Sequence, residues 1–168
     1  MEKGKLFFLI GLARSGKSTF ARKWERLVID IYDNNIIQNH IDNYDNPRVV
    51  ICSDWIRLAL HGQPFAQEAE GLVHELKMLM IRIYINNGYD VLIDGTHTTD
   101  KSIKDILRID KFAQFYLCNT TAAECKKRAI MTNQEYLIER NVIDRMEKQL
   151  ASWRDNAEEH VNKLRNEL

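Results

Sequence analysis

Residues 11–19 constrain the fold of this chain more than any other stretch. They read GLARSGKST and directly follow the apolar run LFFLI. This is a complete G-x-x-x-x-G-K-[ST] pattern. Its glycines let the backbone approach phosphates, its N–H groups attract anionic oxygens, its lysine reaches the β- and γ-phosphates, and its serine ligates Mg²⁺. The pattern needs a strand before it and a helix after it, and the chain supplies both. The sequence therefore predicts a nucleoside-triphosphate site with these ligands: Gly11, Ala13, Arg14, Ser15, Gly16, Lys17, Ser18 and Thr19. Arg14 either contacts a phosphate or faces solvent.

Strand and helix patterns alternate along the rest of the chain. Short apolar runs predict strands at 48–52, 90–94 and 112–117, and helical patterns cover 17–28, 54–60, 66–87 and 101–109, with another starting near 120. Such alternation predicts an α/β fold with three layers, in which helices flank a short, mainly parallel sheet of about four strands. In the helix at 66–87 we expect a core-facing stripe made of Ala69, Leu72, Val73, Leu76, Leu79, Met80, Ile83 and Tyr84.

A narrow apolar seam runs from residue 138 to the end of the chain. It predicts one C-terminal helix of about thirty residues, roughly 45 Å long, that packs along its own domain or, alternatively, pairs with a second copy. Residues 30–47 are rich in Asn and Asp yet carry Ile and Tyr, which indicates an ordered surface insertion. We expect a single domain over 1–168, with a core at about 5–153 and a helical extension at 154–168.

Composition excludes several classes of protein. The 24 basic residues equal the 24 acidic ones, so no global field draws the chain to nucleic acid or to an anionic membrane, and a nucleic-acid substrate would need a local basic cleft. Three cysteines without a CxxC pair indicate a reduced, cytoplasmic protein. The apolar run near the N-terminus is too short for a secretory signal, and no segment approaches the roughly 20 apolar residues of a membrane span.

Two aspartates stand where predicted strands end. Asp54 follows the second predicted strand and Asp94 closes the third, so both should overlook the phosphates from one edge of the sheet. Asp54 and Arg57 lie three apart on one helix face, where the carboxylate can take a proton from a hydroxyl and the guanidinium can hold an anionic part of the same substrate. The alternative is that Asp54, or Ser53, only caps the helix. Asp94 is a Mg²⁺ partner, an acceptor contact or a cap. His97 has a weak claim to contact the acceptor, and we interpret it as a lone exposed histidine.

The order of these motifs resembles the kinase domain of polynucleotide 5′-hydroxyl kinases, of the bacteriophage and bacterial RNA-repair types, within the adenylate-kinase-like P-loop group. The resemblance covers roughly 5–153: the phosphate loop, S53-D54-x-x-R57, a strand ending in D94-x-T96, then E124-C125-K126-K127-R128 and E135-Y136-L137-I138. It implies that Asp54 is the general base and that Arg57 binds the acceptor's 3′-phosphate. It also implies that Lys17 and Ser18 handle ATP and Mg²⁺, and that Arg128 belongs to a lid.

The chain departs from this family pattern after Arg128, where the sequence AIMTNQ lacks the further lid arginines. Arg140 or Arg145 could replace them, or both could be solvated helix charges. No N-K-x-D pattern of GTPases is present, which favours ATP. The expected function is therefore ATP- and Mg²⁺-dependent phosphoryl transfer, with Asp54, Arg57 and Lys17 as catalytic residues, most plausibly to a 5′-hydroxyl of DNA or RNA. The alternatives are a small-molecule kinase, including the zeta-toxin type, and a nucleotide-gated binding module.

Overall fold

The computed structural model describes residues 2–25, 36–38, 46–63 and 67–168. Five strands form one sheet: β1 (Leu6–Gly11), β2 (Ile36–Gln38), β3 (Arg48–Cys52), β4 (Asp90–Asp94) and β5 (Gln114–Cys118). Their order is β2-β5-β1-β4-β3, and all neighbours pair in parallel except β2, which is antiparallel to β5. The predicted α/β class is confirmed. The expected insertion at 30–47 contributes β2 to the sheet edge, and most of its remainder lies outside the described residues.

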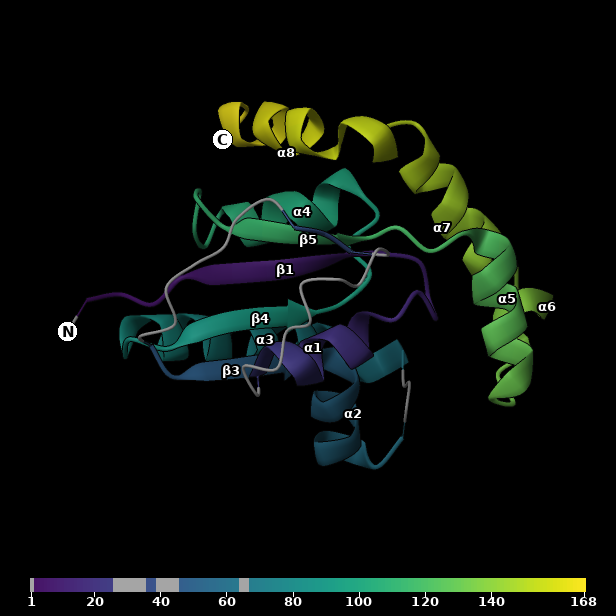
Figure 1. Ribbon diagram of the computed structural model, residues 1–168. Coiled ribbons are helices and arrows are strands. Elements are labelled where there is room, and N and C mark those ends of the chain that lie inside the picture. Colours follow the sequence, from purple (N-terminus) through teal and green to yellow (C-terminus); the bar gives the residue numbers. More distant parts are fainter. Residues whose placement is uncertain (1, 26–35, 39–45, 64–66) are drawn as a thin grey trace.

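Helices cover both faces of the sheet (Figure 1). They are α1 (Lys17–Glu25), α2 (Ser53–His61), α3 (Glu70–Asn86), α4 (Asp100–Leu107), α5 (Ala122–Met131), α6 (Tyr136–Glu139), α7 (Val142–Ala151) and α8 (Ala157–Asn166). Single 3-10 turns stand at Gln67–Ala69 and Arg154–Asn156. Figure 1 places α1 on one face, α3 and α4 on the other, and α5 to α7 beyond one end of the strands.

The central strand β1 supplies the core of both faces because its side chains alternate. Phe7 and Leu9 pack in one cluster with Phe20 and Trp24 of α1. Phe8 belongs to the larger cluster that joins the sheet to α3, α4, α7 and α8. All six residues of β1 are buried, as expected for a parallel strand covered on both sides. The strand can therefore hold the residues at its carboxyl end in a fixed position.

The expected core stripe of α3 is confirmed in part: Val73 is buried, and Leu76, Met80 and Tyr84 pack against the core, but other members of the stripe do not. Leu72, Leu79 and Ile83 are each about half exposed, at 51%, 52% and 51%. The buried face instead repeats at four-residue steps through Val73, Ile81 and Ile85. Apolar residues occur on several faces of this helix, so the sequence pattern did not separate the exposed apolar residues from those that pack on the sheet.

The single long C-terminal helix is also wrong. The chain forms α6, α7 and α8 in turn, because Asn141 takes a left-handed conformation with φ 52° and Trp153 is non-helical with φ −141° and ψ 2°. The apolar seam still packs within its own chain, since Val161 and Leu164 of α8 are buried. The ring of Trp153 stacks on His160 at 4.5 Å between centroids.

All three cysteines, Cys52, Cys118 and Cys125, are buried. None of the helices in the described part of the chain is long and apolar enough to cross a bilayer.

Candidate active site

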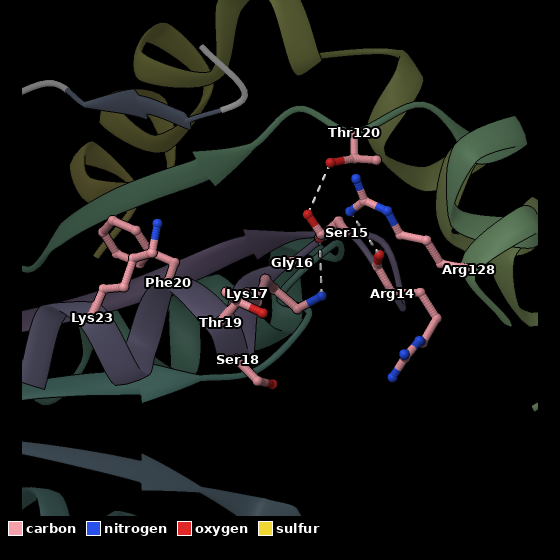
Figure 2. Close-up of a pocket in the computed structure, with 10 residues that line it drawn as sticks. All are labelled: Arg14, Ser15, Gly16, Lys17, Ser18, Thr19, Phe20, Lys23, Thr120 and Arg128. Carbon is pink, nitrogen blue, oxygen red and sulfur yellow. Dashed lines mark hydrogen bonds between the residues drawn. The ribbon is translucent and has the colours of Figure 1, made fainter. Parts of the chain in front are cut away.

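The loop between β1 and α1 surrounds a cavity of about 440 Å³. Gly16 has a φ of +99°, which side-chain-bearing residues rarely adopt. Gly11 permits a close approach, because a Cβ there would lie 2.8 Å from the Ser15 Oγ. The buried Thr120 donates from its hydroxyl to the Ser15 carbonyl at 2.8 Å and so joins the loop to the end of β5. The residues that line the cavity are Arg14, Ser15, Gly16, Lys17, Ser18, Thr19, Phe20, Lys23, Thr120 and Arg128 (Figure 2).

Lys17 lies inside this loop. It is 7% exposed, and its ammonium donates to the Leu12 carbonyl and to the Ser15 Oγ, the latter at 3.3 Å. Burial lowers the pKa of Lys17, while Asp94 is among the groups that favour its charged form. The ammonium therefore points into the ring of backbone groups that the sequence pattern assigns to phosphates.

Asp94 at the end of β4 adjoins the same loop. Burial raises the pKa of the Asp94 carboxyl, and a hydrogen bond with the Ser18 side chain and the charge of Lys17 oppose that rise. A serine hydroxyl beside a carboxylate supplies the hard oxygen ligands that Mg²⁺ prefers, and such sites usually complete their shell with phosphate oxygens and water. The described residues contain no group of three His, Cys, Asp or Glu able to hold a metal ion. The pair thus fits Mg²⁺ held together with a triphosphate.

The candidate arginines occupy different places. Arg128 pairs with Glu124 at 2.9 Å. It lines the phosphate cavity and donates to the Arg14 carbonyl at 3.4 Å (Figure 2). Arg14 lines the cavity as well, with a φ of 67°. Arg140 is exposed at the end of α6 and lines neither this cavity nor the next. Arg145 of α7 lines the second cavity.

A second cavity of about 500 Å³ opens at the carboxyl ends of β3 and β4. It includes Asp54 and Asp94, and Asp54 is among the groups that raise the pKa of Asp94. The Gly11 N–H donates to the Thr96 carbonyl at 3.0 Å, which fastens the loop after β4 to the phosphate loop. The cavity residues are Cys52, Ser53, Asp54, Arg57, Lys77, Asp94, Gly95, Thr96, His97, Thr98, Thr99, Ser102, Arg145, Met146 and Gln149. Asp94 thus faces both the phosphate-loop residues and the second cavity, as its place in the sequence predicted.

Arg57 is held by two carboxylates. Its Nε and Nη2 donate to the two oxygens of Glu70 at 2.7 and 2.6 Å, and its Nη1 donates to Asp54 at 2.5 Å. The Glu70 hydrogen bond is the largest cause of the raised pKa of Arg57, and the same bond lowers the pKa of Glu70. The cap interpretation is wrong, because Cys52 takes the N-cap position of α2 and neither Ser53 nor Asp54 lies there. Asp54 keeps a 72% exposed side chain at the cavity.

His97 is buried, so its interpretation as an exposed residue is wrong. Its Nδ1 lies 2.7 Å from the Leu9 carbonyl and its ring meets Phe8 edge-on. A carbonyl can only accept, so Nδ1 carries the proton and Nε2 is the acceptor nitrogen. Burial lowers the pKa of His97 from 6.5 to about 3, which keeps the ring neutral near pH 7.

Sequence reasoning missed Glu70, Lys77 and Thr120. Glu70 has no local signal, because it meets Arg57 only through the packing of α2 against α3. Thr120 follows a predicted strand, and its position at the strand end could have drawn attention to it. Lys77 had a usable signal, since it is a lysine within an apolar helical pattern.

Several solved structures share this fold. A chain of the Pnkp1/Rnl/Hen1 RNA repair complex matches with a TM-score of 0.70 and 21% identity, over 92% of this chain and 46% of that one. APE1195 matches with a TM-score of 0.58 and 19% identity, over 83% of this chain and 76% of that one. The Mycobacterium tuberculosis APS kinase CysC, solved with AMPPNP and APS, matches with a TM-score of 0.54 and 19% identity. The match covers 77% of this chain and 70% of that one.

These likenesses show a fold shared with P-loop kinases. The chain spans less than half the length of the Pnkp1/Rnl/Hen1 chain that it matches. No protein-family model and no curated protein matches the chain.

Proposed function

We propose that this protein transfers the γ-phosphoryl group of ATP to a hydroxyl, namely the 5′-hydroxyl of a DNA or RNA end. One observation carries the proposal. Asp94 lies beside Ser18 and Lys17 of the phosphate loop and also lines the cavity that holds Asp54. A triphosphate in the loop and an acceptor in the second cavity would therefore meet at this carboxylate. The fold shared with a chain of the Pnkp1/Rnl/Hen1 RNA repair complex supports the same assignment.

The residues have separate parts in the proposed reaction. Asp54 takes the proton of the acceptor hydroxyl as its oxygen bonds to the γ-phosphorus. The bond from that phosphorus to the bridging oxygen breaks, and ADP leaves. Lys17 and Arg128 face the charge that builds up on the transferring group and on the leaving oxygen. Ser18 and Asp94 would hold Mg²⁺, which neutralises phosphate charge when bound.

Arg57 orients the base in this proposal. Its ion pair with Asp54 fixes the carboxylate at the cavity, and Glu70 fixes Arg57 in turn. The 3′-phosphate role implied by the family resemblance would require that phosphate to exchange with Glu70. We assign lid closure over ATP to Arg128 and not to Arg140, because Arg128 lines the phosphate cavity and Arg140 does not.

A small-molecule acceptor is the second candidate. The likeness to the APS kinase supports it, since that structure contains APS, and so does the balanced charge of this chain. Single-stranded nucleic acid is usually held in a basic groove. A nucleotide-gated binding module is the third candidate, and it would consume no ATP in response to any acceptor.

Transfer of radiolabelled γ-phosphate to a panel of acceptors tests these candidates. The panel contains 5′-hydroxyl oligonucleotides of DNA and RNA, nucleosides and mononucleotides. The polynucleotide proposal expects labelled oligonucleotides, and labelling of monomers alone would contradict it. Asp54→Asn should bind ATP as the wild type does and lose about 10²- to 10⁴-fold in transfer, the usual contribution of a general base. Unchanged turnover would remove Asp54 from the mechanism.

A further inference from the structure

Lys77 occupies a core position of α3. The buried face of this helix repeats as Val73, Ile81 and Ile85, and residue 77 stands on the same four-residue repeat. An aliphatic side chain would suit such a position, and a lysine there must bring its charge close to the core. Burial is the largest cause of the lowered pKa of Lys77. A residue that violates the local packing rule in this way is a candidate for function.

No anionic group compensates this charge at close range. Among the described residues, Lys77 forms neither a hydrogen bond nor an ion pair. The carboxylates that act on it from a longer distance are Asp105 and Glu70. Asp105 pairs with Arg108 at 2.7 Å, and Glu70 pairs with Arg57 at 2.6 Å. Both carboxylates are therefore already engaged by other cations.

The side chain of Lys77 lines two adjoining cavities. One is the second cavity described above, which we call the acceptor cavity because the proposed function places the acceptor there. The other is a smaller cavity of about 300 Å³ formed by α3 and α4. His97, Thr99 and Ser102 line both cavities as well, so the two adjoin. The hydroxyls of Thr99 and Ser102 bond to each other and to the local backbone. Among the described residues, Lys77 is the cation that lines both cavities, and its ammonium donors are unused.

We propose that Lys77 binds a phosphate of the acceptor and selects phosphate-bearing acceptors over neutral nucleosides. This proposal rests on the proposed kinase function and adds the charge of the substrate to it. Arg57 is less suited to the task, because two carboxylates surround its single positive charge. Arg145 adds a second cation from α7, but it is exposed and screened by solvent. The half-buried ammonium of Lys77 gives the stronger contact.

The test compares two acceptors that differ by one phosphate, adenosine and adenosine 3′-monophosphate. Lys77→Met removes the charge and keeps a long, flexible chain. Its kcat/KM for adenosine 3′-monophosphate should fall about ten- to a hundredfold, as expected for a lost charged hydrogen bond, while that for adenosine stays within about twofold. Lys163→Met, the same change on the exposed face of α8, serves as the matched control and should alter neither value.

Two further measurements separate this proposal from the kinase proposal. Calorimetric titration with adenosine 3′-monophosphate in the absence of ATP should show binding at least tenfold weaker for Lys77→Met than for wild type. This result is informative even if no transfer is seen. Thermal unfolding should show Lys77→Met at least as stable as wild type, because an uncompensated charge has left the core side of α3. Equal binding by both proteins, or an equal loss for both acceptors, would overturn the proposal.

Discussion

His97 should make the stability of this protein depend on pH in a way that one substitution reveals. Burial lowers the pKa of this side chain from 6.5 to about 3. Between these two values the unfolded chain binds the proton and the folded chain does not, so stability rises with pH over this range and is fully present above pH 6.5. Each unit of pKa difference is worth about 1.4 kcal/mol. Protonation of His97 in the unfolded chain should therefore lower the free energy of unfolding by about 2 kcal/mol between pH 7.5 and pH 5.

Urea unfolding at a series of pH values, followed by tryptophan fluorescence, measures the effect. The reference variant is His97→Asn, which keeps an N–H donor for the Leu9 carbonyl and tolerates the left-handed φ of 41° at this position. Loss of ring packing against Phe8 should lower the stability of the variant by a similar amount at every pH. The other ionisable groups titrate in both proteins, so the difference between the two curves isolates His97.

Parallel curves for the wild type and His97→Asn would refute this reasoning. They would mean that the folded protein accommodates a charged ring at this position. Curves that converge as the pH falls from 7.5 to 5 would support a neutral imidazole in the folded protein.

Three more substitutions test other parts of the structure. Arg128→Ala should raise the KM for ATP at least tenfold, because a charged contact to the phosphates is lost, and steady-state kinetics measures this. Thermal unfolding should change little, because the ion pair of Arg128 with Glu124 is half-exposed and worth well below 1 kcal/mol. Leu164→Ala should cost about 2–5 kcal/mol in urea unfolding, since Leu164 is fully buried within its own chain, and an unchanged midpoint would contradict intramolecular packing of α8. Arg57→Ala should lower kcat for every acceptor alike if Arg57 positions Asp54, whereas a loss confined to phosphate-bearing acceptors would restore its 3′-phosphate role.

The sequence predicted those features that depend on local patterns. The phosphate loop, four of the five strands and the placing of Asp54 and Asp94 at one sheet edge follow from short motifs and from the geometry of parallel sheets. The sequence did not predict strand β2, because three residues inside an Asn-rich stretch are too few to show the pattern of a strand. Contacts between distant segments were equally out of reach. Glu70 meets Arg57 only after α3 packs beside α2, and His97 becomes buried only when its loop folds over β1.

The break between α7 and α8, which the sequence did not predict, affects how the acceptor cavity is built. An unbroken helix of thirty residues would run straight for roughly 45 Å and could follow only one side of the domain. The observed chain ends α7 at Ala151 and starts α8 at Ala157, with Trp153 non-helical between them. This bend lets α7 bring Gln149 to the loop after β4, where Thr98 donates to it at 2.8 Å.

The same bend lets α8 pack along α4. Its His160 lies 2.9 Å from Asp100, and its end is tied down by the ion pair of Lys104 with Glu167 at 2.7 Å. Figure 1 shows the chain turning between α7 and α8. Arg145 of α7 lines the cavity, so one wall of the cavity depends on this break in the apolar seam. The break between α7 and α8 thus helps to enclose the candidate site. The periodic apolar pattern of the sequence gives no sign of this break.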